Sequence, residues 1–493
     1  MQILLLFCFA FAWIVSGSSN ADADIDTMSC ICRELKRLRG SYTFNETSDS
    51  YQSATAIDNN RCRVNPLVVI LPLDEADIQL SMLAAQHCKL PFSTVSGGHG
   101  AAGYELAKNG VTISMSLMTA VTTDLAGVMT VQPGARFKKI YENTPEGWVP
   151  VGGGCPMVSS GGYYLGGGWS FLSRSYGLAV DSLLSVTTVL ANSSIIIANA
   201  TSSCTGGCAD LWWASRGGGG GNFGVVSSYS VQLQKALPTI LIGELCWKED
   251  VDVSDLSSIW DWLMDAYPTI PYYLQIDPGW LPLGLDGARL FCFTVICNHD
   301  DETKCRELID PVASRDDLTL NTMQMQPYLT WQLAPQQTGG ITAAQHGYLY
   351  LTNLIMPHGS LTSEVMEHIQ RDILASPSPR NIVISHMGGG AIQHVPSNAT
   401  AFPHRDAQFV LQIKAIWEVD TEEERVANMD WVRQLSAWLE PFSTGGSYVN
   451  YMDPLLNDWA RRYYGANLQR LSTIKRAVDP DNFFSFNQSI PLL

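Results

Sequence analysis

One histidine and one cysteine of this sequence follow runs of glycine, a setting in which a side chain can do chemistry. His99 stands in the stretch VSGGHG (residues 95–100), and Cys155 follows three glycines in VGGGC (residues 151–155). A histidine in such a turn can ligate a metal, transfer a proton, pack into the core or have a rarer role. The sequence has neither an HExxH motif nor a Cys2His2 spacing, so no metal site is expected at His99.

Three glycine-rich loops predict a large cofactor that carries phosphate. Glycine lets the main chain approach a ligand closely and turn its N–H groups toward an anion. Flexible surface loops are the alternative, but mobile linkers would not carry Tyr163, Trp169 and Phe223. The loops are SGGHGAAG (96–103), VGGGCPMVSSGGYYLGGGWS (151–170) and RGGGGGNFG (216–224).

The third loop contains a G-x-G-x-x-G spacing at Gly219, Gly221 and Gly224. In dinucleotide-binding folds this motif follows a strand and opens a helix. Here the stretch VVSSYSVQL follows, and its composition predicts a strand. A Rossmann fold is therefore not expected, and the GxxxxGK[ST] phosphate loop is absent from the sequence.

Nearly all of residues 45–493 resembles the berberine bridge enzyme-like flavoproteins of the vanillyl-alcohol oxidase superfamily, in particular carbohydrate oxidases of the glucooligosaccharide oxidase type. The resemblance is specific because the matching stretches keep their order and spacing. They are SGGHGAAGYE, GGGCPMVSSGGYYLGGGWSFLSRSYGLAVDSLLS, DLWWASRGGGGGNFGVV, ATAFPHRD, SYVNYMD and the ending RRYYGANLQRLSTIKRAVDPDNFFSFNQSIP.

The resemblance implies an FAD that is bound covalently at two points. In that family the histidine of the first loop bonds the 8-alpha methyl group of the flavin, and the cysteine of the second loop bonds carbon 6. These roles fall on His99 and Cys155. The resemblance places around the same cofactor Ser96, Gly97, Gly98, Gly100, Gly154, Val158, Gly162, Gly166, Gly167, Gly168, Gly224, Val225, Val226 and Asn450.

The resemblance also assigns the catalytic side chains. The second tyrosine of a Tyr-x-Asn-Tyr motif commonly serves as the base, which here is Tyr451, and Tyr448 lines the same site. The pKa of a tyrosine, near 10 in water, must be lowered for that task near neutral pH. Sugar oxidases of the family assist with a carboxylate two residues after a glutamine. Gln412 matches the glutamine, but Lys414 replaces the carboxylate and could either stabilise a tyrosinate or point away.

Val158 stands where the family is thought to control the access of dioxygen. Valine resembles the oxygen-using members, whereas isoleucine accompanies poor oxygen reactivity. A role in packing alone is the alternative. The resemblance therefore favours an oxidase that passes electrons to O2 over a dehydrogenase.

The elements that position these residues alternate between short strands and helices. Residues 65–73 predict a buried strand, and residues 74–88 predict a helix that begins at the cap Asp74. Residues 182–200 predict a hairpin. Further strands are expected at 90–96, 110–116, 128–135, 287–297 and 407–419, and amphipathic helices at 256–267 and 361–374.

We expect an α+β fold with a two-part FAD-binding domain of the vanillyl-alcohol oxidase type and an α+β substrate domain with an antiparallel sheet. Residues 1–20 predict a signal peptide, because the apolar run from Ile3 to Val15 is too short to span a bilayer. The expected parts are the FAD-binding domain (21–236), the substrate-binding domain (237–440) and a C-terminal segment that completes the FAD-binding domain (441–493).

Charge and cysteines favour a secreted protein. The net charge of −17 argues against nucleic acid or anionic lipid as partner. Loss of Cys8 with the signal peptide leaves 11 of the 12 cysteines, an odd number. The spacings Cys30/Cys32, Cys204/Cys208 and Cys292/Cys297/Cys305 suggest disulfide-bonded loops, and with Cys155 on the flavin ten cysteines remain for up to five disulfides. Glycosylation sequons occur at Asn45, Asn192, Asn199, Asn398 and Asn487.

Three functions are compatible with these observations. The favoured one is a secreted, monomeric oxidase that converts the anomeric hydroxyl of mono- or oligosaccharides to a lactone and releases H2O2. The second keeps the chemistry but acts on aromatic or allylic alcohols or other specialised metabolites. The third is a flavin-carrying binding protein with little turnover. Stacking on sugar rings could be supplied by Trp260, Trp262, Trp280 and Trp331.

Overall fold

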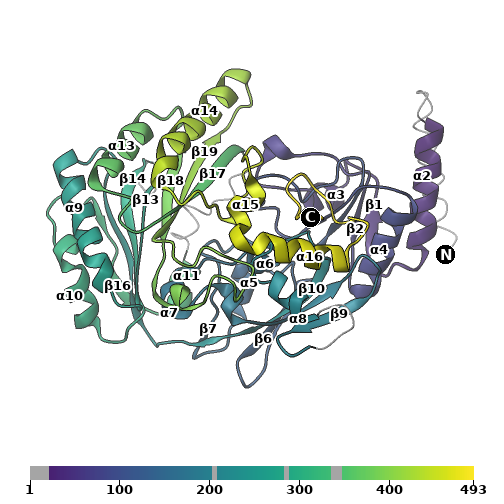
Figure 1. Cartoon of the computed structure of the whole chain (residues 1–493), viewed down its shortest axis with the longest axis horizontal. Helices are drawn as coiled ribbons and strands as arrows, with labels where there is room; N and C mark the ends of the chain where they lie inside the picture. The colour runs from purple at the N-terminus through teal and green to yellow at the C-terminus, as the bar shows by residue number, and fades with distance from the viewer. Residues whose placement is uncertain (1–20, 203–207, 283–287, 335–346) are drawn as a thin grey trace.

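The chain folds into two lobes that lie side by side (Figure 1). The computed structural model describes residues 21–202, 208–282, 288–334 and 347–493. The expected signal peptide and Cys204 lie outside the described residues. Within the described residues, one lobe is built around an eight-stranded sheet, and the other contains a four-stranded, a five-stranded and a two-stranded sheet.

The first sheet follows the order β1-β2-β4-β3. Both β2 and β3 pair with β4 in parallel, whereas β1 is antiparallel to β2. The Asp74 side chain accepts a hydrogen bond from the Asp77 amide and begins α4 (Glu75–His87), as predicted. The strands are β1 (Ser41–Thr43), β2 (Val68–Leu71), β3 (Phe92–Val95) and β4 (Val111–Ser114).

The second sheet is antiparallel and follows the order β5-β6-β10-β8-β9. The predicted hairpin is confirmed, since β8 and β9 pair from Ser185 with Asn199 to Val189 with Ile195. A strand, β10, begins directly after Gly224, so the third glycine loop does not open a helix. The strands are β5 (Val121–Thr123), β6 (Val128–Val131), β8 (Leu183–Val189), β9 (Ile195–Asn199) and β10 (Val225–Gln232).

The third sheet is the antiparallel sheet expected in the second half of the chain. It follows the order β15-β12-β14-β13-β18-β19-β17, and β16 also pairs with β12. Its strands are β12 (Ile240–Lys248), β13 (Leu274–Leu281), β14 (Leu290–Cys297), β15 (Leu320–Asn321), β16 (Gln324–Gln326), β17 (Tyr348–Met356), β18 (Ile382–Met387) and β19 (Phe409–Trp417).

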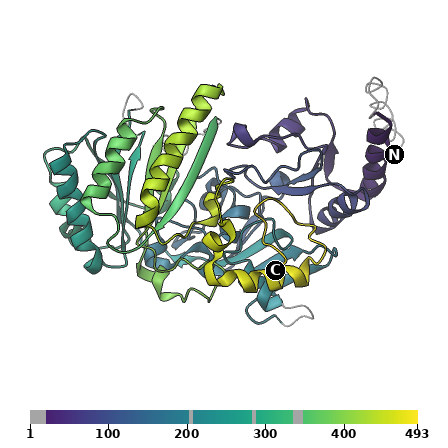
Figure 2. The same cartoon turned by 45° about the horizontal axis from the view of Figure 1, so that its top comes forward.

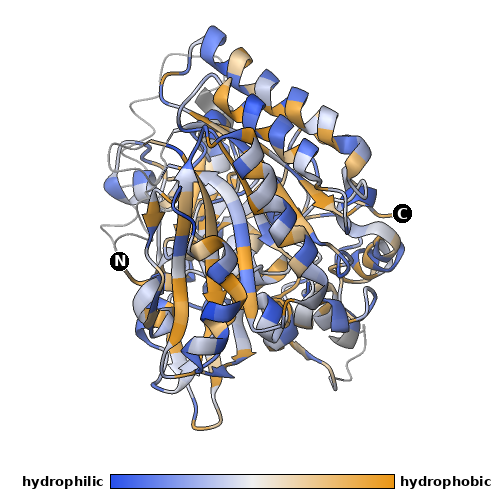
Figure 3. Ribbon diagram, turned by 90° about the vertical axis from the view of Figure 1, so that its left-hand side faces the viewer, coloured by the Kyte–Doolittle hydropathy of each residue, from blue (hydrophilic) through white to orange (hydrophobic). Residues whose placement is uncertain are grey.

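Helices cover one face of this sheet, and its other face lies toward the first lobe (Figure 2). Figure 3 looks onto these helices, which carry hydrophilic residues along their lengths. Alternation along β19 explains the two faces: Leu411 and Ile413 pack in the core beneath the helices, whereas Gln412 and Lys414 line a cavity on the opposite side. The helices are α9 (Val253–Ala266), α10 (Glu302–Ala313), α13 (Ser363–Leu374) and α14 (Glu422–Leu439).

Buried arginines hold the two lobes together. Arg174, in α7 (Ser173–Tyr176), donates hydrogen bonds to the carbonyl oxygens of Ile270, Leu274 and Gly388 in the second lobe. Arg405 forms a two-pronged ion pair with Asp181, at 2.7 and 2.8 Å. Because Arg174 has these carbonyl partners, and Arg405 its carboxylate partner, in the other part of the chain, separating the lobes would leave buried charge unpaired.

The chain returns to the first lobe after α14. Here α15 (Trp459–Tyr464) and α16 (Leu468–Val478) pack on the glycine loops (Figure 1). Lys475 of α16 is fully buried, pairs with Asp479 at 2.5 Å and donates to the carbonyl of Asn222 in the third glycine loop. Within the described residues, no helix combines the length and apolar character that a membrane span needs.

Three disulfides join described cysteines, and two of them differ from the local loops expected. Cys297 and Cys305 close a short loop, as their spacing suggested. Cys30 pairs with Cys88, which ties α2 (Ala21–Glu34) to the end of α4. Cys246 pairs with Cys292 across β12 and β14. Cys62 is a thiol, so the ten remaining cysteines do not all form disulfides.

Candidate active site

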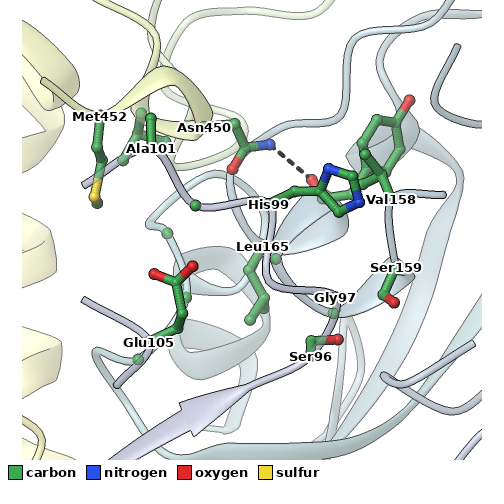
Figure 4. A pocket seen from close by; sticks show the side chains of 18 of the residues that line it. Ser96, Gly97, His99, Ala101, Glu105, Val158, Ser159, Leu165, Asn450 and Met452 are labelled. Atoms are coloured by element: carbon green, nitrogen blue, oxygen red, sulfur yellow. Dashed lines mark hydrogen bonds between the residues drawn. The ribbon is translucent and has the colours of Figure 1, made fainter. Parts of the chain in front are cut away.

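A cavity of about 480 Å³ lies where the glycine loops meet β17, β18 and β19. It brings together most of the residues predicted to surround a flavin and its substrate. Those that line it are Ser96, Gly97, Gly98, His99, Gly100, Gly154, Cys155, Val158, Gly162, Gly224, Val225, Val226, Gln412, Lys414, Tyr448, Asn450 and Tyr451. Figure 4 shows part of this wall, with Ser96, Gly97, His99, Val158 and Ser159.

Gly166, Gly167 and Gly168, also predicted to surround the cofactor, are not among the residues that line the cavity. They allow close packing behind its wall instead. A Cβ atom on Gly166 would lie 1.9 Å from Oδ1 of Asn450, and one on Gly168 would lie 2.5 Å from Cβ of Ala179. These glycines therefore let the second loop pack closely against the Tyr-x-Asn-Tyr motif.

His99 is held by a carboxylate that the sequence did not single out. Its Nδ1 atom lies 2.6 Å from Oδ2 of Asp58. The Asp58 amide donates to the carbonyl of Gly98 at 2.8 Å, so the first loop and the Asp58 segment are locked together. Gly98 adopts φ +75°, where a Cβ would lie 2.4 Å from the Ala56 carbonyl oxygen. Asp58 had no motif around it that could have marked it in the sequence.

Cys155 reaches the same cavity from the second loop, and it is a thiol in this structure. Burial raises the pKa of this thiol. Hydrogen bonds from the amides of Met157 and Val158 and the charge of Lys414 oppose that rise. The thiol and the His99 imidazole therefore face one space, although they are 56 positions apart in the chain.

The cavity wall fits a flat cofactor with phosphate groups. Gly162 lines the cavity, and a Cβ built on it would meet no atom within 4 Å. Gly219 and Gly221 adopt positive φ angles of 83° and 72° and line the same wall, together with Gly220. Main chain without side chains is thus exposed to the cavity, as close approach to a phosphate-bearing ligand requires.

Tyr448 and Asn450 form a hydrogen-bonded support beneath the cavity. The Tyr448 hydroxyl oxygen accepts hydrogen bonds from the amides of Gly168 and Trp169, at 3.0 and 3.2 Å, and from Nδ2 of Asn450. Asn450 also donates to the carbonyl of Tyr163, the dashed line of Figure 4. Tyr448 is 2% exposed. Its hydroxyl therefore positions the second glycine loop.

Tyr451 has a partner that the sequence did not indicate. Its hydroxyl lies 2.8 Å from Nε2 of His386, and Nδ1 of that ring lies 3.1 Å from Oδ2 of Asp277. Burial, and then the neighbouring Tyr448, raise the pKa of Tyr451 instead of lowering it. His386 is a single histidine in a strand-like stretch, so only the fold reveals its place.

Gln412 and Lys414 both face the cavity from β19. Lys414 does not point away from the site. Burial lowers the pKa of its amine, and the nearby Asp58 and Cys155 oppose that effect. The lysine charge therefore acts on the side of the cavity that holds the imidazole and the thiol.

The tryptophans predicted to stack on sugar rings do not line the cavity, and that expectation is wrong. Trp260, Trp280 and Trp331 are at most 5% exposed and pack in the core. Trp262 packs against the same core beneath the helices. The tryptophan that reaches the cavity is Trp169, from the second glycine loop. The sequence signal for these four was weak, because most tryptophans are buried in cores.

Glu105 is a further acidic group on the cavity wall (Figure 4). Burial raises its pKa to about 7, while the amides of Glu105 and Gly100 act in the opposite direction. The folded protein therefore binds this proton more tightly than the unfolded chain. The stabilisation from this group is full below pH 4.5 and is lost as the pH rises through 7.

Glu105→Gln should remove this pH dependence. We expect the free energy of unfolding of the wild type to fall, between pH 4.5 and 8, by up to about 3 kcal/mol more than that of the variant. Urea denaturation of the holoprotein at several pH values measures the difference. Glu142→Gln, at an exposed helical position, is the control and should follow the wild type. Parallel curves for wild type and Glu105→Gln would contradict the assignment.

The fold and the cavity together define a FAD-binding oxidoreductase. Residues 66–199 match the family described as "FAD binding domain", and residues 447–491 match the family described as "Berberine and berberine like". The two matches include the first two glycine loops and the Tyr448–Tyr451 motif. By these two matches the chain is similar to the berberine bridge enzyme-like FAD-linked oxidoreductases.

Relatives with this fold cover nearly the whole chain. Xylooligosaccharide oxidase of Thermothelomyces thermophilus is 28% identical over 459 residues, covering 88% of this chain and 88% of the relative. Berberine bridge enzyme-like 12 of Arabidopsis thaliana is 27% identical and covers 92% and 90%. The solved structure of xylooligosaccharide oxidase from Myceliophthora thermophila C1 with xylobiose is 25% identical, with a TM-score of 0.81, covering 94% of this chain and 99% of that chain.

Proposed function

We propose that this protein is a secreted, monomeric oxidase that oxidises the anomeric hydroxyl of mono- or oligosaccharides to a lactone and passes the electrons to O2, which gives H2O2. The observation that carries the proposal is the meeting of His99, Cys155 and Tyr451 in one cavity. These residues come from three distant segments, and they are the imidazole, the thiol and the phenol that a covalently bound flavin and an alcohol substrate need.

We propose that FAD is held covalently by His99 and Cys155, and that the glycine loops lining the cavity would bind its phosphates. FAD supplies hydride acceptance and reoxidation by O2 when it is bound. The protein binds and orients the substrate and moves its hydroxyl proton. Residues 21–236 and 441–493 form the FAD-binding part in this proposal, and residues 237–440 form the substrate-binding part.

A carbohydrate substrate is supported by the polar side of the cavity. Gln412, Lys414 and His386 face it from β18 and β19, and each can bond to hydroxyl groups. Trp169 and Phe171 supply aromatic surface at the same cavity. A relative covered over most of its length is named for its action on xylooligosaccharides. Secretion is supported by the three disulfides, because such bonds persist in oxidising compartments.

A substrate panel tests the proposal. The purified holoenzyme is mixed with xylo-, cello-, malto- and chito-oligosaccharides and, separately, with benzylic and allylic alcohols. We expect anaerobic bleaching of the flavin and aerobic H2O2 release with at least one sugar series. Bleaching by the alcohols alone would move the enzyme to specialised metabolites, and no bleaching by any compound would indicate a flavin-carrying binding protein.

The position of Val158 leads to a prediction about the rate at which O2 reoxidises the flavin. Val158 lines the cavity three residues after Cys155. Val158→Ile adds a methylene group to that wall and should slow the reoxidation of the reduced flavin by O2 about tenfold, because overpacking closes the approach path. Stopped-flow mixing of the reduced enzyme with O2 measures the rate. The control Val253→Ile, at an exposed helical position, should leave it unchanged. Equal rates for wild type and Val158→Ile would assign Val158 to packing.

A further inference from the structure

The hydroxyl of Tyr451 begins a chain of hydrogen bonds that leads away from the cavity. His386 Nε2 lies 2.8 Å from the hydroxyl, and His386 Nδ1 lies 3.1 Å from Oδ2 of Asp277. Tyr451 belongs to η8 (Val449–Tyr451), His386 to β18 and Asp277 to β13. Both Tyr451 and His386 line the cavity.

The surroundings of Asp277 determine which way the hydrogen bonds run. Its Oδ1 accepts hydrogen bonds from Nε2 of Gln275, at 2.5 Å, and from the amide of Met387, at 2.9 Å. Both donors bind one oxygen of this carboxylate, and an ionised carboxylate can only accept a hydrogen bond at the other oxygen, Oδ2. His386 therefore carries its proton on Nδ1, and Nε2 is left to accept a hydrogen bond from the Tyr451 hydroxyl.

The sheet fixes this arrangement. Gly279 pairs with Ile384 between β13 and β18, and the same register places Asp277 opposite His386. A further strand, β17, holds Tyr451, because Nδ2 of its residue Asn353 donates a hydrogen bond to the Tyr451 carbonyl at 2.9 Å. The His386 ring also stacks on Trp169, with 6.4 Å between ring centroids. The three side chains are thus positioned by backbone elements and do not depend on a flexible loop.

We propose that His386 accepts the proton of Tyr451 while Tyr451 takes the proton of the substrate hydroxyl, and that Asp277 is the positioning residue for His386. The proposal rests on the proposed function. The substrate O–H bond breaks, and its electron pair stays on the substrate oxygen. That proton binds Oη of Tyr451, whose own proton binds Nε2 of His386. The positive imidazolium that results is paired with the Asp277 carboxylate.

This relay removes a difficulty in the use of Tyr451 as a base. Burial raises the pKa of Tyr451, so a free tyrosinate is not available near neutral pH. Passing its proton on at the moment of transfer needs no tyrosinate beforehand. Among the described residues, Asp277 is the side chain bonded to Nδ1 of His386. The other titratable groups that act on this set from packed elements are Arg174, Tyr328, Cys155 and Tyr448, and Lys414 lines the same cavity from the neighbouring strand β19.

The first test uses a sugar of the substrate panel that bleaches the flavin. It measures the rate at which this sugar reduces the flavin without oxygen, from pH 5 to 9. We expect the wild-type rate to fall at low pH, because a protonated imidazole cannot accept the proton of Tyr451. His386→Ala should lower the rate about 100-fold and abolish this acid limb, and added imidazole should restore part of the rate. Asp277→Asn should move the acid limb to lower pH, because the imidazolium loses its carboxylate.

A matched control is available on the surface. His394 bonds to the hydroxyl of Tyr272 at 2.6 Å, but it is exposed and does not line the cavity. His394→Gln removes a bond of the same type and should leave both rate and pH profile unchanged. A His386→Gln variant as fast as His394→Gln, with the acid limb kept, would overturn the relay.

The second test needs no substrate. NMR spectra of the holoenzyme with 15N-labelled histidine report the tautomer of His386, whose signals are identified by their loss in His386→Gln. We expect a proton on Nδ1, an Nδ1 signal that shifts in Asp277→Asn, and an Nε2 signal that shifts in Tyr451→Phe. Ring signals of His386 that are identical in all three proteins would overturn the relay. If no compound of the panel reduces the flavin, the proposed function fails and this test still decides the relay.

Discussion

Tyr451→Phe is expected to lower the rate of flavin reduction by the sugar about 1,000-fold, the range typical of losing a general base. The phenylalanine keeps the ring and its packing against Tyr448, at 5.1 Å between centroids, and removes only the hydroxyl that bonds to His386. The affinity for the substrate should change little, because the variant loses an interaction that is made with the reacting proton in the transition state and not in the ground state.

Stopped-flow reduction under anaerobic conditions measures this effect, with FAD content and thermal unfolding as checks of folding. Tyr176→Phe is a suitable control, since its hydroxyl bonds to the carbonyl of Lys235 outside the cavity. The control should reduce at the wild-type rate. A Tyr451→Phe enzyme within a few-fold of the wild type would show that another group takes the substrate proton.

The double variant His99→Ala/Cys155→Ala should lose all flavin colour from an acid-precipitated pellet, which the wild type should retain. Acid unfolds the protein and releases a cofactor held only by packing and hydrogen bonds. Each single variant should keep its colour through the remaining bond, because the imidazole and the thiol reach the same cavity from different loops.

Peptide mass spectrometry assigns each bond, since the peptide with His99 or with Cys155 should carry the mass of the flavin. Cys62→Ala is the matched control, because Cys62 is also a thiol in this structure and does not line the cavity. It should retain the colour of the wild type. A colourless pellet from folded wild-type protein would refute both bonds, and colour that survives the double variant would place the attachment elsewhere.

Local sequence patterns predicted the structure correctly where interactions between neighbouring residues determine it. Asp74 caps α4 as predicted, because a cap needs only its own side chain and an amide three residues later. The β8–β9 hairpin followed from two β-branched runs around a short turn. The predicted pairing of cysteines failed where Cys30 and Cys246 bond to partners 58 and 46 positions away, since spacing along the chain does not report such distances.

By itself the sequence determined the glycine loops, the imidazole of His99, the thiol of Cys155 and the tyrosine motif, because residue type and order carry that chemistry. Only the tertiary structure placed Asp58 on His99, and Asp277 and His386 behind Tyr451. It also buried Trp260 and Trp280 and exposed Trp169 to the cavity. The reason is physical: each contact joins residues from separate elements, and the bond between His386 and Asp277, 109 positions apart, depends on sheet register, about which a short sequence pattern contains no information.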